Sequence, residues 1–166
     1  MVTGSVSALA SAGISVAIRK GAQKPDISTA DTLKRALLAA KSVTYLNPTD
    51  GGASGIHFAK VLEKLGIAGE MKSKTMLAPK ASAIGPMVAS GEAELGILQY
   101  QLLFAVPGID IAGPLPGELQ NTTVFSAAIV TSSKSVDAAK ALIGFLRTPE
   151  ADAVIRAKGM DPVSRQ

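Results

Sequence analysis

Residues 47–66, NPTDGGASGIHFAKVLEKLG, place three glycines and a serine just where a helix is predicted to begin. The first N–H groups of a helix have no partner within it, and the helix dipole makes that end partly positive. Glycines at such a position let an anion approach the backbone closely. The segment therefore predicts an anion site formed by the N–H groups of Gly52, Ala53 and Ser54. The alternative is that the glycines only form a turn and that Ser54 caps the helix.

Two further polar side chains stand near the ends of predicted strands. Arg19 lies near the end of the strand predicted over 13–21, and Gln99 lies near the end of the strand predicted over 93–101, closing its part 93–99. Ligands on parallel sheets bind at the carboxyl ends of strands, where helices begin. We therefore expect Arg19 and Gln99 to lie on the same rim as Ser54, with Arg19 available to hold a carboxylate through two parallel hydrogen bonds. Alternatively, Arg19 is a surface cation and Gln99 satisfies neighbouring backbone groups.

The elements that would position these residues alternate between strand and helix along the chain. Short apolar runs bounded by Gly, Pro or Asn predict six strands, over 13–21, 42–47, 73–78, 93–101, 107–118 and 122–132. Apolar stripes at helical spacing predict helices over 28–41, 54–65 and 82–91, and two more beginning at Ser135 and at Thr148-Pro149. This alternation predicts an α/β fold with a mainly parallel sheet. The last strand is almost uncharged, so we expect it to be buried on both faces.

Composition excludes several classes of function. The chain has 166 residues, is 47% hydrophobic and 18% charged, and carries a net charge of +4, which suits a packed domain with a slight preference for anions. With no cysteine and one histidine, His57, it has no disulfide and no thiolate or histidine cluster for a metal. With no Trp and two Tyr, no base-stacking surface for nucleic acid is expected. No cofactor is predicted. The phosphate-loop pattern G-x-x-x-x-G-K-[ST] is absent, which disfavours an enzyme that holds phosphate at GGASG. No apolar run is long enough to span a membrane, and the N-terminus lacks the pattern of a signal peptide.

The phrases GGASGIHFAKVLEKLG, GEAELG and TPEADAVI, in this order and spacing, carry a family resemblance that covers roughly residues 5–163. The chain resembles type II periplasmic solute-binding proteins, and within them the molybdate-binding-protein-like branch. Such proteins have two α/β lobes joined by two crossing strands. The resemblance implies that residues 1–19 hold the outgoing crossing strand, that 20–117 form the second lobe, and that 118–166 hold the returning strand and the closing helices of the first lobe.

The resemblance also implies a function. Members of this family bind a small solute between their lobes and deliver it to an ABC transporter permease in the periplasm, without acting as enzymes. The molybdate binders hold their oxyanion through backbone N–H groups at the position of Gly52-Ala53-Ser54 and through a tyrosine hydroxyl at the position of Gln99. Here an amide replaces the phenol, and Arg19 stands at the hinge. The ligand expected is therefore a small anion: an oxyanion, a carboxylate or a phosphorylated organic acid.

Family members begin with about half as much sequence again, so this chain is expected to be truncated and to hold only a remnant of the first lobe. Apolar helices left uncovered would favour a homo-oligomer. Two other functions remain open. One is an enzyme that uses GGASG as a phosphate cradle, and the other is the effector-sensing domain of a regulator, for which a helix-turn-helix would be expected upstream.

Overall fold

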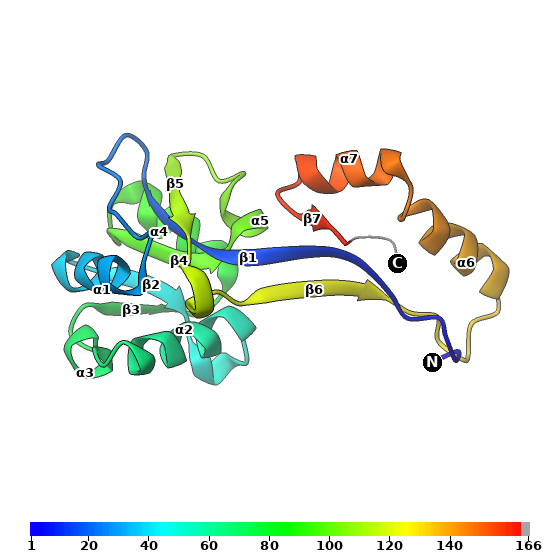
Figure 1. Cartoon of the computed structure of the whole chain (residues 1–166), viewed down its shortest axis with the longest axis horizontal. Helices are drawn as coiled ribbons and strands as arrows, with labels where there is room; N and C mark the ends of the chain where they lie inside the picture. Colours follow the sequence, from blue (N-terminus) through cyan, green and yellow to red (C-terminus); the bar gives the residue numbers. More distant parts are fainter. Residues whose placement is uncertain (164–166) are drawn as a thin grey trace. The chain divides into compact units, whose positions relative to one another are not determined.

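The computed structural model describes residues 1–163. The chain divides into two compact units. The larger unit is Gly13–Asn121, and the smaller unit combines Met1–Ala12 with the chain from Thr122 onward. The lobe expected over 20–117 lies inside the larger unit. In Figure 1 the larger unit runs from blue to yellow-green, and the closing helices of the smaller unit are orange and red.

The larger unit contains five strands and five α-helices, which follow the predicted alternation. The strands are β1 (Ser7–Arg19, of which 7–12 belong to the smaller unit), β2 (Val43–Leu46), β3 (Thr75–Ala78), β4 (Leu95–Gln99) and β5 (Ile109–Pro114). The helices are α1 (Ala30–Ala39), α2 (Ala53–Lys64), α3 (Ala68–Met71), α4 (Ala81–Ser90) and α5 (Tyr100–Leu103), with 3-10 turns η1 (Pro48–Asp50) and η2 (Gly117–Leu119).

The strands form a sheet in the order β3-β2-β4-β1-β5. Strand β2 runs parallel to both β3 and β4. Strand β1 runs antiparallel to both β4 and β5. The predicted α/β class is confirmed, and the sheet has a parallel part and an antiparallel part. The direction of β1 decides where its carboxyl end lies, as described below for Arg19.

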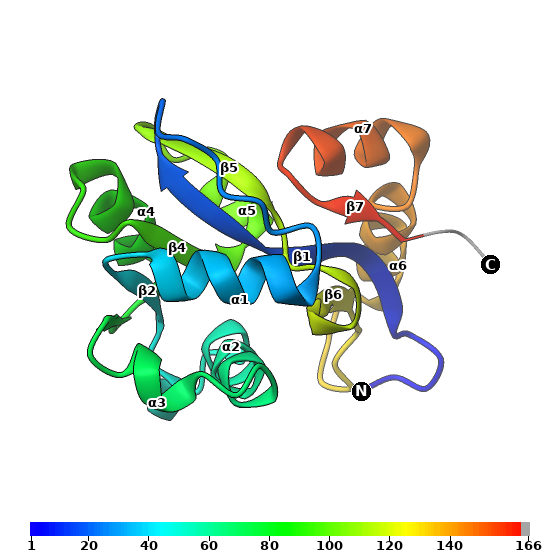
Figure 2. The same cartoon turned by 60° about the vertical axis from the view of Figure 1, so that its left-hand side comes forward.

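Helices cover both faces of this sheet (Figures 1 and 2). On one face, Ile14, Val16 and Ile18 of β1 join a buried cluster with side chains of α1, α2 and α3. On the other face, Ala17 and Leu98 join a cluster with α4 and α5. Successive strand residues point to opposite faces, so each strand contributes to both clusters. The result is a three-layer α/β/α unit whose sheet is shielded from water on both sides.

Helix α2 forms as its sequence predicts. Phe58, Val61 and Leu62, spaced at i, i+3 and i+4, are at most 3% exposed. Gly66, with φ of 70°, then ends the helix, because this backbone conformation is easily adopted only by glycine. The packed stripe therefore fixes which face of α2 meets the sheet, and hence where the start of the helix lies.

The smaller unit contains β6 (Thr122–Ala127), α6 (Val136–Phe145), α7 (Pro149–Ala157) and β7 (Asp161–Pro162). Both β6 and β7 pair with β1. Helix α7 begins as predicted, with Thr148 as its cap and proline in the first turn. The prediction of a strand over 122–132 buried on both faces is wrong, because β6 is shorter and mostly exposed. Apolar composition makes burial of a strand favourable, but the strand is buried only where another element packs against it.

No helix in the described chain, residues 1–163, combines the length and the apolar character needed to cross a membrane.

Candidate functional site

The start of α2 presents several main-chain donors. Gly52 is the N-cap residue, with extended backbone angles. The first hydrogen bond of the helix runs from the N–H of Ile56 to the carbonyl oxygen of Gly52, at 3.0 Å. The N–H groups of Ala53, Ser54 and Gly55 precede it and have no acceptor within the helix. With the positive end of the helix dipole, they form a group of donors suited to an anion.

The glycines in this segment have structural reasons of their own. Gly51 has φ of 78°, a left-handed conformation that other residues rarely adopt. A Cβ atom on Gly55 would lie 2.2 Å from the carbonyl oxygen of Leu46, and one on Gly52 would lie 2.8 Å from the Leu46 side chain. The helix start therefore packs directly on the end of β2. This supports the turn interpretation of the glycines, which by themselves do not demonstrate an anion site.

Ser54 does not cap the helix, so that part of the alternative is wrong. It is the second residue of α2, only 2% exposed. Its Oγ atom is buried and has no hydrogen-bond partner among residues 1–163. Leaving a buried hydroxyl unpaired costs about 1–3 kcal/mol, and most buried polar groups avoid it. The hydroxyl of Ser54 thus retains hydrogen-bonding capacity next to N–H groups that have no acceptor within the helix.

Strand order places this helix start at a point where ligands commonly bind. After β2 the chain enters α2, which packs on one face of the sheet, and after β4 it enters α5, which packs on the other face. Because β2 and β4 are parallel neighbours, the chain leaves both strands at the same end of the sheet, and the two connections then go to opposite faces. Such switch points form ligand crevices in α/β sheets. Gln99, half-buried, is the last residue of β4 and lies at this edge.

Arg19 does not share this edge, so the prediction that places it with Ser54 and Gln99 is wrong. Gln99 pairs with Ile14 of β1, and Leu95, at the other end of β4, pairs with Ile18. Arg19 follows Ile18, five residues beyond Ile14, which corresponds to about 17 Å along a strand. Because β1 is antiparallel to β4, its carboxyl end lies where β4 begins.

His57 forms a hydrogen bond within the fold. Its Nε2 atom lies 2.8 Å from the carbonyl oxygen of Leu119 in η2, which accepts a hydrogen bond from the ring. This bond ties α2 to the segment that leaves β5. In the described part of the chain, no group of three or more His, Cys, Asp or Glu residues could hold a metal ion.

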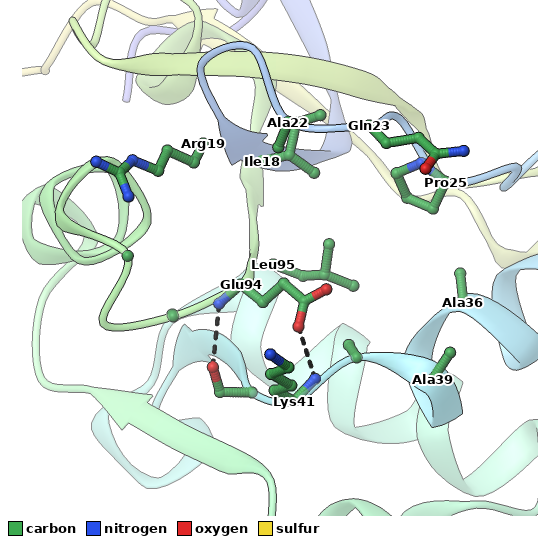
Figure 3. A pocket seen from close by; sticks show the side chains of 14 residues that line it. Ile18, Arg19, Ala22, Gln23, Pro25, Ala36, Ala39, Lys41, Glu94 and Leu95 are labelled. Carbon is green, nitrogen blue, oxygen red and sulfur yellow. Dashed lines mark hydrogen bonds between the residues drawn. The ribbon is translucent and has the colours of Figure 1, made fainter.

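Arg19 instead lines a pocket of about 450 Å³ in the larger unit, together with Lys41 and Glu94 (Figure 3). We call it the Arg19 pocket. The sequence alone does not reveal this pocket, because its residues come from three separate segments and form no motif. Only the antiparallel pairing of β1 with β4 brings Arg19 near the residues that precede β4.

Comparison with known proteins agrees with the fold. A family model described as bacterial extracellular solute-binding protein matches residues 1–161. The chain is 39% identical over 154 residues to a protein named aconitate isomerase from Pseudomonas sp, which covers 92% of the chain and 57% of the relative. It is 32% identical over 126 residues to the molybdate-binding protein ModA of Azotobacter vinelandii, which covers 73% of the chain and 48% of the relative. The chain thus spans about half the length of the curated relatives it matches.

A solved structure also shares the fold. It is a substrate-binding domain assigned to a molybdenum ABC transporter from Clostridium difficile, with a TM-score of 0.83 and 17% sequence identity. The superposition covers 99% of this chain and 69% of the other. Together these matches confirm the resemblance to the molybdate-binding branch of the type II periplasmic solute-binding proteins. Because the family model matches nearly the whole chain, the protein belongs to the bacterial extracellular solute-binding protein family.

Proposed function

We propose that this chain binds a small anion at the start of α2, as part of a solute-binding protein that serves an ABC-type uptake system. The observation that carries the proposal is the buried hydroxyl of Ser54, unpartnered among residues 1–163, beside main-chain N–H groups that have no acceptor within the helix. Its partner would be a transporter permease, and its compartment the periplasm, as in the family.

The proposed site relies on neutral donors. The N–H groups of Gly52, Ala53 and Ser54 and the Ser54 hydroxyl would donate to the anion, and the helix dipole would favour its negative charge. Gln99, at the end of β4, would add an amide. An amide oxygen also accepts hydrogen bonds, so Gln99 suits a ligand that carries a hydroxyl or a protonated carboxyl group as well as a charge.

We favour a carboxylate as the ligand rather than molybdate. The relative named for aconitate is 39% identical over 92% of the chain, against 32% over 73% for the molybdate-binding relative. Arg19 lies at the other end of the strands and does not contribute to this preference. The carboxylate is favoured by the higher identity to the relative named for aconitate and by the amide of Gln99.

A backbone-donor variant tests the proposal. Ala53→Pro removes one N–H at the first helical position, where proline is well tolerated, and the extended angles of Gly52 suit a residue before proline. Thermal shift and calorimetry with cis-aconitate, trans-aconitate, citrate, phosphate and molybdate identify the ligand. We expect Ala53→Pro to weaken its binding by about 1.5–3 kcal/mol. The matched control is Ala30→Pro, at the first position of α1. Equal binding by both variants would exclude the start of α2 as the site.

A second candidate function is isomerisation of aconitate, favoured by the identity to the relative of that name. Incubation with each isomer, followed by chromatographic separation of the two, tests it directly. Interconversion that depends on Ser54 or Gln99 would make the protein an enzyme. Binding of aconitate without interconversion would leave it a solute-binding protein.

A further inference from the structure

The Arg19 pocket is separate from the proposed anion site. It lies where β4 begins, whereas the proposed anion site lies where β4 ends. Its volume is about 450 Å³, within the range of small-molecule sites. Residues that precede β2 and β4, namely Ser42 and Glu94, form one wall. The loop that follows β1 forms another, and α1 forms a third (Figure 3).

Glu94 places a negative charge in this pocket in a fixed orientation. Its Oε2 atom accepts a hydrogen bond from the main-chain N–H of Lys41 at 2.7 Å, and its own N–H donates to the Ser42 hydroxyl at 3.0 Å. Within residues 1–163, no Lys or Arg side chain forms an ion pair with this carboxylate. The carboxylate is therefore preorganised and keeps acceptor capacity on its second oxygen.

Arg19 places a positive charge on another side of the pocket (Figure 3). Its Nη1 atom lies 3.4 Å from the position that a Cβ on Gly91 would take, so the guanidinium lies beside the turn that ends α4. In the part of the chain that the structure describes, it makes no salt bridge. Lys41 also lines the pocket, which therefore presents two cations, Arg19 and Lys41, and one anion, Glu94, with no ion pair among the three in the described chain.

The space between these charges is lined by small and apolar side chains. Ile18 and Leu95, which pair across β1 and β4, are buried beneath it. Ala36 and Ala39 of α1 face it from the side (Figure 3). Alanines leave room that larger residues would fill, and the apolar floor favours an aliphatic group.

We propose that the Arg19 pocket binds a free aliphatic α-amino acid. Its carboxylate pairs with Arg19, its ammonium group pairs with Glu94, and its side chain covers Ile18 and Leu95. A simple anion would pair with Arg19 but leave the free oxygen of Glu94 without a donor, and a simple amine would pair with Glu94 but be repelled by Arg19. A zwitterion satisfies both charges at once. The proposal does not depend on the function proposed for α2.

The ligand class is tested by nuclear magnetic resonance titration of the full chain with L-leucine, L-isoleucine, L-valine and L-alanine. L-Leucine should shift the amide signals of Ala22, Ala39 and Gly91. Two analogues each lack one charge: 4-methylpentanoate lacks the ammonium group, and 3-methylbutylamine lacks the carboxylate. Each analogue should bind at least roughly tenfold more weakly than L-leucine, since each loses a hydrogen bond to a charged group. Equal binding of 4-methylpentanoate, or no shift at these amides with any of the four amino acids, overturns the proposal.

Paired variants locate the site. Arg19→Gln and Glu94→Gln should each weaken binding of L-leucine roughly tenfold or more. Glu94→Gln keeps an oxygen that can accept from the N–H of Lys41. Lys20→Gln and Glu92→Gln remove the same charges from exposed neighbours outside the pocket, and should bind as the parent does. Ala39→Leu, on exposed helix surface, should block binding by filling space without changing charge. If the controls lose binding equally, or if Ala39→Leu binds normally, the assignment is wrong.

Discussion

A Cβ atom on Gly55 would stand 2.2 Å from the carbonyl oxygen of Leu46, far inside van der Waals contact. Since the obstacle is backbone at the end of β2, it cannot rotate away. We predict that Gly55→Ala destabilises the protein by about 1–3 kcal/mol, as overpacking does, measured by urea unfolding. Gly69→Ala is the control, because a Cβ there meets no atom within 4 Å. It should leave stability unchanged or raise it.

Ser54→Ala should change protein stability and ligand binding in opposite directions. Removing a buried hydroxyl that lacks a partner should raise the free energy of unfolding by about 1 kcal/mol. If that hydroxyl serves the ligand, the same change should weaken binding of the anion found by thermal shift. Ser90→Ala, which removes an exposed hydroxyl that donates to Met87, is the comparison. A variant that loses stability and binds normally would show that Ser54 has a structural role.

Gln120 should prove important for stability at the point where the larger unit begins. Its Oε1 atom accepts from the N–H groups of Ile14 at 2.8 Å and Asn121 at 2.9 Å, and its Nε2 donates to the Ile14 carbonyl at 2.9 Å. Gln120→Ala would remove the acceptor of the Ile14 and Asn121 N–H groups, while the Ile14 carbonyl would keep its hydrogen bond from the N–H of Leu115 at 3.0 Å. We expect a loss of about 1–3 kcal/mol and faster hydrogen exchange at Ile14. Gln23→Ala, at an exposed position, should change neither; unchanged exchange at Ile14 in Gln120→Ala would contradict the prediction.

The stabilisation that Asp26 gives to the folded state should depend on pH in a known direction. Its Oδ1 atom accepts from the main-chain N–H of Ser28 at 3.0 Å and from the Ser28 hydroxyl at 2.7 Å. The main-chain bond first, and then the hydroxyl bond, lower the pKa of Asp26 below its ordinary value of 3.8. Because the folded-state pKa is lowered, the stabilisation is present above pH 3.8 and is lost as the pH falls through the folded-state value.

The difference in melting temperature between the parent and Asp26→Asn should therefore shrink as the pH falls below 3.8. A nuclear magnetic resonance titration of the Asp26 carboxyl measures the pKa itself. A midpoint at or above the ordinary value would contradict the prediction.

The expected homo-oligomer remains a prediction, and α6 offers a test. Leu142 and Phe145, three residues apart on this helix, are 58% and 59% exposed. Exposed apolar patches promote association. We expect the chain to self-associate in light scattering after size exclusion, and Leu142→Lys with Phe145→Lys to reduce the association. Val130→Lys, which removes an exposed apolar side chain outside α6, should reduce it less. A monomeric parent chain would refute the prediction.

Local features of this protein could be determined from its sequence. The stripe of Phe58, Val61 and Leu62 identified the buried face of α2, and Gly66 identified its end. Thr148-Pro149 identified the start of α7. These features depend on residues at most a few positions apart, since helical hydrogen bonds and caps span one turn. Where two neighbours compete, local pattern decides less: Ser28 and Thr29 both suit the cap of α1, and Thr29 is the cap, because Thr32 reciprocates its hydrogen bond.

The tertiary structure alone decided which of the candidate residues lie together. The sequence shows that Arg19 ends a strand, but not that the strand runs antiparallel to β4, which removes Arg19 from the edge of Ser54 and Gln99. It shows glycines before α2, but not that Gly55 packs on Leu46. It does not connect Glu94 with Arg19. Strand direction and close packing depend on partners dozens of residues away, and those contacts are chosen by the whole core rather than by local propensity.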